Sequence, residues 1–176
     1  MQAKCENIYL VGLMGAGKTT VGKALAKRLG WQFHDSDHEI AARTGVSIPT
    51  IFEIEGEAGF RRRETQVIEE LTNLRNVVVA TGGGAVLAQE NRDCLSRNGV
   101  VVYLNASPAQ LFERTRHDRN RPLLQVPDPL GKLKTLHAER GPLYEAVADI
   151  VIDGNRCNAT AAVQQIMSEM DRRCSH

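Results

Sequence analysis

A glycine-rich segment near the start of the chain constrains the fold most strongly. Residues Gly12–Thr20 read GLMGAGKTT and fit the pattern G-x-x-x-x-G-K-S/T. An apolar run, Ile8–Val11, leads into this segment, and a helical pattern over Lys18–Leu29 leads out of it. Glycines here allow backbone N–H groups to curl around phosphate oxygens, and the positive end of the next helix points at the anion. A glycine-rich turn that merely joins a strand to a helix is the alternative, but the context favours a phosphate-binding loop.

The rest of the chain alternates short apolar runs with longer helical patterns. Near-continuous apolar strands separated by helices are typical of a parallel sheet that is covered on both faces. The predicted strands are Ile8–Val11, Trp31–Phe33, Val77–Ala80, Val100–Leu104 and Ile150–Ile152. The predicted helices are Lys18–Leu29, Phe60–Leu74, Pro108–Thr115 and Ala159–Met170, and a further helical stretch starts around Leu130. We therefore expect all 176 residues to form a single three-layer αβα domain around a five-stranded parallel sheet.

Two segments interrupt this alternation. Residues 34–60 lie between the second strand and the helix that begins at Phe60, and we expect an inserted helical segment there. Residues 113–127 carry Arg119, Arg121 and two prolines, with few side chains that could anchor them. A long, charged loop in a compact domain is usually functional or disordered, so we expect a lid.

Charge and cysteine usage exclude several classes of protein. Lys and Arg number 22 against 21 Asp and Glu, so a net charge of +1 gives no reason to expect nucleic acid or a membrane as partner. The cysteines, Cys5, Cys94, Cys157 and Cys174, are scattered and fit neither a zinc site nor a secreted disulfide framework. We expect reduced thiols in a cytoplasmic protein. No apolar run approaches the ~20 residues that span a bilayer, and we expect residues 171–176 to be frayed.

Within the glycine-rich segment, two side chains carry the expected chemistry. Lys18 would reach the β- and γ-phosphates of ATP, and the hydroxyl of Thr19 would bind Mg²⁺. Asp35 and Asp37 follow the second strand, where ligands bind in open α/β sheets. If the segment is extended, both carboxylates face the same side, so one can hold the waters of the metal and the other a substrate hydroxyl. The alternative is an N-cap cluster for the next helix.

Charged residues and glycines at two further places can complete a site. Arg61 and Glu64 share a helix face, so Glu64 can orient the guanidinium; an ordinary surface pair is the alternative. Gly82–Gly84 follow the third strand and permit close approach of a ligand, unless they form only a flexible or left-handed turn.

Two other arginines lie outside these motifs. Arg121, in the expected lid, can close over the γ-phosphate, or belong to a disordered basic loop. Arg140 can pair with an anionic substrate, or interact with the carbonyl groups at a helix end.

Together these residues resemble the shikimate kinase family, within the P-loop kinases that are similar to nucleoside monophosphate kinases. The segments that carry the resemblance are Gly12–Thr20, Asp35–Asp37, Phe60–Glu64, Gly82–Gly84, Arg121–Leu123 and Arg140–Tyr144, in the order typical of the family. The phosphate-binding loop alone would indicate only the superfamily, whereas the whole set is much more selective. The resemblance implies a cytoplasmic, monomeric enzyme of aromatic amino-acid (chorismate) biosynthesis that transfers the γ-phosphate of ATP to the 3-hydroxyl of shikimate.

The resemblance also implies roles for individual residues. It assigns ATP binding to Gly15, Ala16, Gly17, Lys18, Thr19, Thr20, Arg114, Arg121 and Cys157. It assigns substrate binding to Asp37, Arg61, Glu64, Gly82, Gly83, Gly84 and Arg140, with residues 34–60 as the substrate-binding segment. Lys18, Asp37 and Arg121 are the expected catalytic residues, and Thr19 binds Mg²⁺ with Asp35 acting through water. Cys157 stands where relatives often carry a larger polar or basic side chain.

Several rival functions remain open at this point. A gluconate kinase handles a similar carboxylated polyol, and a nucleoside monophosphate kinase has the same fold; the motif set disfavours both. A nucleotide-dependent switch would need a guanine-reading N-K-x-D motif or a partner surface, and a nucleic-acid-dependent ATPase does not suit the near-neutral charge.

Overall fold

The computed structural model describes residues 2–119, 121–155 and 158–175, and its centre is a five-stranded parallel sheet. The strands are β1 (Asn7–Val11), β2 (Gln32–Asp35), β3 (Val77–Ala80), β4 (Val100–Asn105) and β5 (Ile150–Asp153). Their order across the sheet is β2-β3-β1-β4-β5, and every neighbouring pair is parallel. All residues of β1 and β3 are buried, as expected for central strands covered on both faces. The predicted fold class is confirmed.

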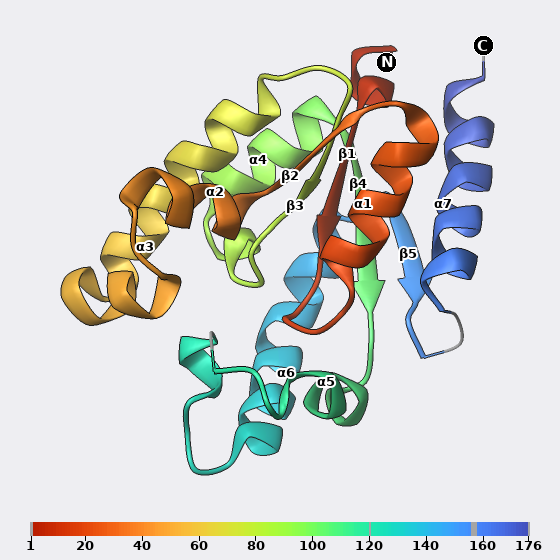
Figure 1. Cartoon of the computed structure of the whole chain (residues 1–176). Helices are drawn as coiled ribbons and strands as arrows, with labels where there is room; N and C mark the ends of the chain where they lie inside the picture. Colours follow the sequence, from red (N-terminus) through yellow and green to blue (C-terminus); the bar gives the residue numbers. More distant parts are fainter. Residues whose placement is uncertain (1, 120, 156–157, 176) are drawn as a thin grey trace.

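Helices cover both faces of the sheet (Figure 1). They are α1 (Lys18–Leu29), α2 (Ser36–Thr44), α3 (Ile48–Thr72), α4 (Gln89–Asn98), α5 (Pro108–Thr115), α6 (Pro129–Val147) and α7 (Ala159–Cys174), with 3-10 turns η1 (Gln2–Glu6), η2 (Ala85–Leu87) and η3 (Pro122–Leu124). Helices α1 and α7 pack together on one face; α4 and α6 cover the other, with α3 beside α4. No helix among the described residues is long and apolar enough to cross a membrane.

The differences from the predicted elements have physical causes. Helix α3 begins at Ile48 rather than Phe60, because the backbone bends at Gly56 (φ 73°) and a second helical segment continues on the far side. An ion pair between Arg63 and Glu55, 2.6 Å apart, bridges this bend. Helix α4 was not predicted, because its sequence is mostly polar and buries only Asn91 and Leu95. Residues 34–60 do form the expected helical insertion, through α2 and the first part of α3.

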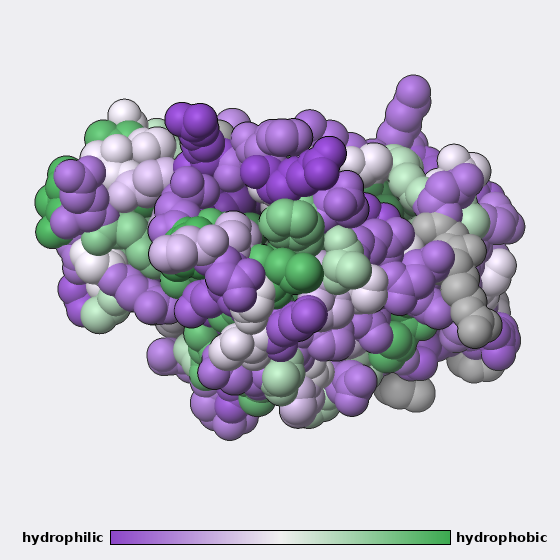
Figure 2. All heavy atoms as spheres, turned by 90° about the horizontal axis from the view of Figure 1, so that it is seen from below, coloured by the Kyte–Doolittle hydropathy of each residue, from purple (hydrophilic) through white to green (hydrophobic). Residues whose placement is uncertain are grey.

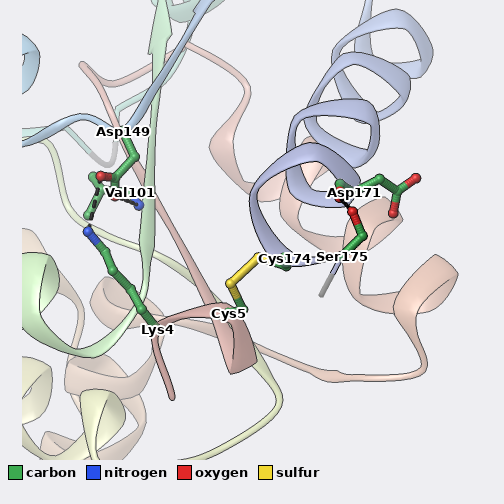
Figure 3. The surroundings of a disulfide bond; sticks show 7 residues. All are labelled: Lys4, Cys5, Val101, Asp149, Asp171, Cys174 and Ser175. Atoms are coloured by element: carbon green, nitrogen blue, oxygen red, sulfur yellow. Dashed lines mark hydrogen bonds and ion pairs between the residues drawn. A yellow bond between two sulfur atoms is a disulfide. The ribbon is translucent and has the colours of Figure 1, made fainter. Parts of the chain in front are cut away.

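The two ends of the chain are fastened to each other, contrary to the prediction. Cys5 in η1 and Cys174 at the end of α7 form a disulfide, with their Cα atoms 5.9 Å apart (Figure 3). Beside it, Lys4 Nζ donates to Asp149 Oδ1 at 3.0 Å, and Arg173 donates to the main-chain carbonyl of Asp149 at 2.6 Å.

The predictions of four reduced thiols and of a frayed tail are therefore wrong for Cys5, Cys174 and the end of α7. The pairing joins residues 169 positions apart, so it depends on how the termini meet in the fold and not on local cysteine spacing. Cys94 is a free thiol.

Candidate active site

The loop between β1 and α1 forms the floor of a cavity of about 270 Å³. Gly17 takes a left-handed conformation (φ 96°) at the start of α1, which a residue with a Cβ would adopt only with strain. Lys18 Nζ donates to the carbonyl oxygens of Gly12 at 2.6 Å and Leu13 at 2.9 Å. Burial, with help from the nearby charge of Arg121, lowers the pKa of Lys18 to about 8. An anion bound in the cavity would stabilise the charged form of Lys18 and raise its pKa again, so the cavity favours a phosphate group.

The cavity brings together the predicted metal residues and most of the predicted nucleotide residues. Its walls are Met14, Gly15, Gly17, Lys18, Thr19, Thr20, Asp35, Asp37, Thr81, Gly82, Gly83, Arg114 and Arg121. Thr19 Oγ1 donates to Asp35 Oδ2 at 2.9 Å, so the two residues predicted for Mg²⁺ lie in contact. A hydroxyl and a carboxylate oxygen are ligands that suit Mg²⁺, which keeps several waters and takes few protein ligands. The residues present therefore fit the ion.

The aspartates reach the site by a different geometry from the one predicted. The segment Asp35–Asp37 is not extended throughout, because α2 begins at Ser36. Asp35 is the N-cap, and its Oδ1 accepts from the N–H groups of Asp37 at 3.0 Å and His38 at 3.2 Å. The capping alternative is thus correct for Asp35, and the same side chain also accepts from Thr19. Asp37, in the first turn of α2, still faces the cavity.

A second pocket adjoins the first. Its lining comprises Met14, Asp37, Ile48, Phe52, Phe60, Arg61, Glu64, Gly82, Gly83, Gly84, Arg121, Pro122, Leu123 and Arg140. The two cavities share Met14, Asp37, Gly82, Gly83 and Arg121, so a group bound in the second pocket stands next to the phosphate-binding cavity. Every residue predicted for the substrate lines this second pocket. Both pockets lie toward the carboxyl ends of the strands, where the surface is mainly hydrophilic with small apolar areas (Figure 2).

Arg61 and Glu64 form the predicted ion pair. Arg61 Nη1 lies 2.9 Å from Glu64 Oε1, and its Nη2 lies 3.3 Å from Glu57 Oε1. Glu64 is completely buried, and this burial raises the pKa of its carboxyl to about 7, against the opposing charge of Arg61. Burial also raises the pKa of Asp37, and the neighbouring charge of Asp35 adds to the effect. Both carboxyl groups thus hold a proton more readily than they would in water.

The glycines after β3 make room for side chains of the protein itself. A Cβ on Gly82 would stand 2.6 Å from Asp37 Oδ1 and 2.8 Å from Glu64 Oε2, and a Cβ on Gly84 would stand 2.3 Å from Arg61 Nη2. All three glycines in the turn have φ outside the left-handed region, so the alternative of a left-handed turn is wrong. The groups that approach these glycines closely are acidic and basic residues of the protein that line the pocket, and the close approach of a ligand stays a prediction.

Several buried polar atoms in this pocket have no hydrogen-bond partner. Among the described residues five such side-chain atoms occur, and three of them are Asp37 Oδ1, Arg61 Nε and Glu64 Oε2. Buried polar groups are nearly always paired in folded proteins, so a cluster of unpaired ones in a cavity indicates a polar ligand. Arg140, which is 4% exposed, adds positive charge to the same pocket. The pocket therefore suits a small, hydroxylated anion.

Arg121 lies in the wall that both cavities share. Its Nε donates to Asp118 Oδ2 at 3.2 Å, and it directly precedes the 3-10 turn η3. This turn lies between α5 and α6, within the segment predicted as a lid. The structure thus places Arg121 where the phosphate-binding cavity meets the second pocket.

A third cavity, of about 240 Å³, continues the phosphate-binding loop toward the start of α7. It is lined by Ala16, Gly17, Thr20, Val21, Leu104, Arg114, Ile152, Gly154, Asn158, Ala159 and Ala162. Its lining is mixed, with apolar side chains that suit the faces of a flat ring. Arg114 Nη1 donates to the carbonyl of Gly15 at 3.0 Å, which fixes the arginine at the edge of the loop. The prediction for Cys157 lies outside the described residues.

Sequence reasoning assigned no role to several residues of the site. Ile48 and Leu123 supply apolar walls to the second pocket. Leu123 belongs to the segment Arg121–Leu123 but received no role there, and nothing in the local sequence separates Ile48 from an ordinary core residue. Ser36 Oγ accepts from the N–H of Gly82 at 2.9 Å and so anchors the glycine turn. Its position between two aspartates was the only available signal.

Comparison with known proteins agrees with this geometry. The model of the family described as "Shikimate kinase" matches residues 14–171. The shikimate kinase of Dechloromonas aromatica is 64% identical over 167 residues, which cover 95% of this chain and 91% of the relative. The chain belongs to the shikimate kinase family. The family member of Thiobacillus denitrificans is 59% identical and matches 96% of this chain and 92% of its own length.

Solved structures of the shikimate kinase family superpose closely. The shikimate kinase from Acinetobacter baumannii, in complex with shikimate, has a TM-score of 0.93 and 51% identity, and the match covers 96% of this chain and 94% of that one. A gluconokinase from Sinorhizobium meliloti reaches a TM-score of only 0.61 at 18% identity, which shows a shared fold and nothing more. The predicted family is confirmed, and the comparison does not support the gluconate kinase alternative.

Proposed function

We propose that this chain transfers the γ-phosphate of ATP to the 3-hydroxyl of shikimate, giving shikimate 3-phosphate and ADP. The observation that carries the proposal is the shared wall between the phosphate-binding cavity and the polar second pocket. Asp37 and Arg121 line both, so an acceptor hydroxyl and a terminal phosphate would meet beside them. Catalysis of phosphoryl transfer depends almost entirely on such positioning together with electrostatic stabilisation.

The second pocket supplies groups that match each part of shikimate. Two arginines, Arg61 and Arg140, suit its carboxylate, because guanidinium groups bind carboxylates with two parallel hydrogen bonds. The unpaired carboxylate oxygen of Asp37 accepts from a ring hydroxyl. Glu64 holds Arg61 in place through their 2.9 Å ion pair. The main chain of Gly82–Gly84 faces the same space, and its lack of side chains lets the ring approach closely.

Transfer then depends on orientation and on charge. Asp37 orients the 3-hydroxyl and takes up its proton as the new oxygen–phosphorus bond forms. Because its pKa is raised, Asp37 binds a proton more readily than an ordinary aspartate, which suits a general base. Lys18 and Arg121 stabilise the negative charge on the phosphoryl group in the loose transition state. Closure of the segment that carries Arg121 excludes water, which would otherwise accept the phosphoryl group in place of shikimate.

The proposal includes Mg²⁺, held by Thr19 and, through water, by Asp35. When bound, the ion would neutralise part of the negative charge of the ATP phosphates. Thr19 would hold it through a lone pair of its hydroxyl oxygen, which leaves the O–H free to keep donating to Asp35. Arg114 and the cavity beside α7 receive the adenine ring. We further propose that the enzyme acts as a monomer in the cytoplasm, with ATP and shikimate as its small-molecule partners.

The direct test is ADP release from ATP and Mg²⁺, with shikimate, gluconate, AMP or no acceptor supplied in parallel. Turnover should require shikimate, and Asp37→Asn and Lys18→Met should each lower kcat by about 10²-fold or more. Arg43→Gln, which changes an exposed ion pair on α2 away from both pockets, is the matched control and should leave kcat unchanged. A folded sample that binds ATP but turns over only gluconate or AMP would refute the acceptor while sparing the nucleotide site.

A further inference from the structure

The glycine turn of the acceptor pocket is held from behind by a tyrosine that lines neither cavity of the proposed reaction. Tyr144, in α6, is completely buried, and its hydroxyl donates a hydrogen bond to the carbonyl oxygen of Gly83. Arg140 lies one turn earlier on the same helix, and a Cβ on Gly83 would stand 3.7 Å from Arg140 Nη1. Tyr144 therefore contacts the turn directly beside a charged group that faces the acceptor.

The surroundings of Tyr144 fix both its ring and the role of its hydroxyl. Its ring packs on Tyr103, with the ring centroids 5.0 Å apart. Burial raises the pKa of Tyr144 above its usual value, with the charge of Arg140 opposing the shift, so the hydroxyl remains a donor at any physiological pH. The hydroxyl of Tyr103 points to a different partner, Asn105 Oδ1, at 3.1 Å. The pair of tilted rings thus offers two partly buried hydroxyls, of which the one on Tyr144 bonds to the turn.

Glycine residues cannot hold this turn by themselves. They carry no side chains, and their backbone is free to adopt many conformations. Ser36 Oγ accepts from the N–H of Gly82 at 2.9 Å, and Tyr144 donates to the next carbonyl, so the turn is fixed by hydrogen bonds at two successive residues. Loss of the tyrosine hydroxyl would leave the partly buried Gly83 carbonyl without this donor, and the turn would shift to find another.

We infer that Tyr144 is a positioning residue for the acceptor pocket: its hydroxyl fixes the Gly83 carbonyl and thereby the Gly82–Gly84 main chain that faces the acceptor. It acts through the turn and touches neither the acceptor nor the nucleotide. This inference rests on the proposed function for the identity of the acceptor. It predicts a defect in acceptor binding without a comparable defect in nucleotide binding.

The test compares Tyr144→Phe with Tyr103→Phe, which removes the other hydroxyl of the same pair of rings. Tyr144→Phe should raise KM for shikimate about tenfold, since the loss of one buried hydrogen-bond donor costs that order of affinity. KM for ATP should stay within about twofold of the wild type, and Tyr103→Phe should change neither constant by more than that. A KM for shikimate that is unchanged in Tyr144→Phe, or an equal rise for ATP, would overturn the inference.

Amide hydrogen exchange of the unliganded proteins provides a readout that does not depend on the acceptor. Amides of Gly82–Ala85 should exchange several-fold faster in Tyr144→Phe than in the wild type or in Tyr103→Phe. Unchanged exchange would overturn the positioning role even if kinetics were altered. If exchange is faster in Tyr144→Phe but the wild type does not phosphorylate shikimate, Tyr144 still positions the turn. Only the proposed acceptor is then overturned.

Discussion

Reduction of the Cys5–Cys174 disulfide should lower the free energy of unfolding by several kcal/mol. The bond joins residues 169 positions apart and so closes nearly the whole chain into a loop. In the chain-entropy relation, a cross-link of this span restricts the unfolded state by about 5 kcal/mol at 25 °C. Native disulfides usually deliver about 2–5 kcal/mol, so we expect a loss of about 4 kcal/mol.

The ion pair beside the disulfide cannot replace it. Lys4 and Asp149 are both partly exposed, and pairs of this kind contribute about 0–1 kcal/mol. The hydrogen bond from Arg173 to the carbonyl of Asp149 holds the end of α7 in the native state, but it does not restrict the unfolded chain. For a domain of this length, a loss of about 4 kcal/mol lowers Tm by roughly 8–16 °C.

The assay is urea unfolding followed by circular dichroism, on oxidised protein and on protein kept in a thiol reductant. The double variant Cys5→Ser/Cys174→Ser should match the reduced wild type and should not respond to reductant. Cys94→Ser, which removes a free thiol, should respond as the wild type does. Thiol titration before unfolding establishes the redox state of each sample. If the oxidised and reduced wild types differ by less than about 1 kcal/mol, the entropic argument is refuted.

Three further predictions concern the site. Gly82→Ala should lower kcat/KM for shikimate at least about 100-fold, because its Cβ would stand 2.6 Å from Asp37. Gly83→Ala should have a much smaller effect, because its Cβ would stand 3.5 Å from the nearest atom. Equal losses in the two variants would contradict this steric account. Lys18→Met should weaken ATP binding in calorimetry by about tenfold or more, and unchanged affinity would show that the lysine does not reach the phosphates. The pKa of Glu64 is raised to about 7, so its contribution to stability is complete below pH ~4.5 and is lost as the pH rises through 7. Glu64→Gln should flatten that fall in denaturation measured from pH 5 to 8, and parallel curves for the two proteins would exclude Glu64 as its source.

The parts of the fold that the sequence predicted are those set by local pattern. Helix α1 was predicted residue for residue, because a glycine loop begins it and Gly30 ends it with a left-handed cap. The five strands were predicted to within two residues at each end, and most closely at β3, where every residue is apolar and buried. Helix α4 has no such pattern, because its sequence is mostly polar and only Asn91 and Leu95 are buried.

The sequence predicted which residues form the candidate site better than it predicted how those residues are arranged. Asp37, Arg61, Gly83 and Arg140 come from four separate segments, and the sequence identified them through motifs whose spacing matches the family. The sequence did not predict that Asp35 would cap α2 and contact Thr19 through its other oxygen. That dual role requires the ends of β2 and the start of α1 to lie side by side, which only the order of the strands determines.

The glycine turn after β3 shows why motif reasoning identifies such residues without explaining them. A glycine can be required by its own backbone angles or by whatever packs against its Cα, and the sequence does not separate the two. Here the packing partners are Asp37, Arg61 and Glu64, which lie 18 to 45 positions before the glycines that they contact. Since those side chains also face the acceptor pocket, any substitution that adds a Cβ to Gly82 or Gly84 displaces the charged groups themselves. The turn therefore limits the positions that the charged side chains of the pocket can take. In return, those side chains require glycine at positions 82 and 84 of the turn.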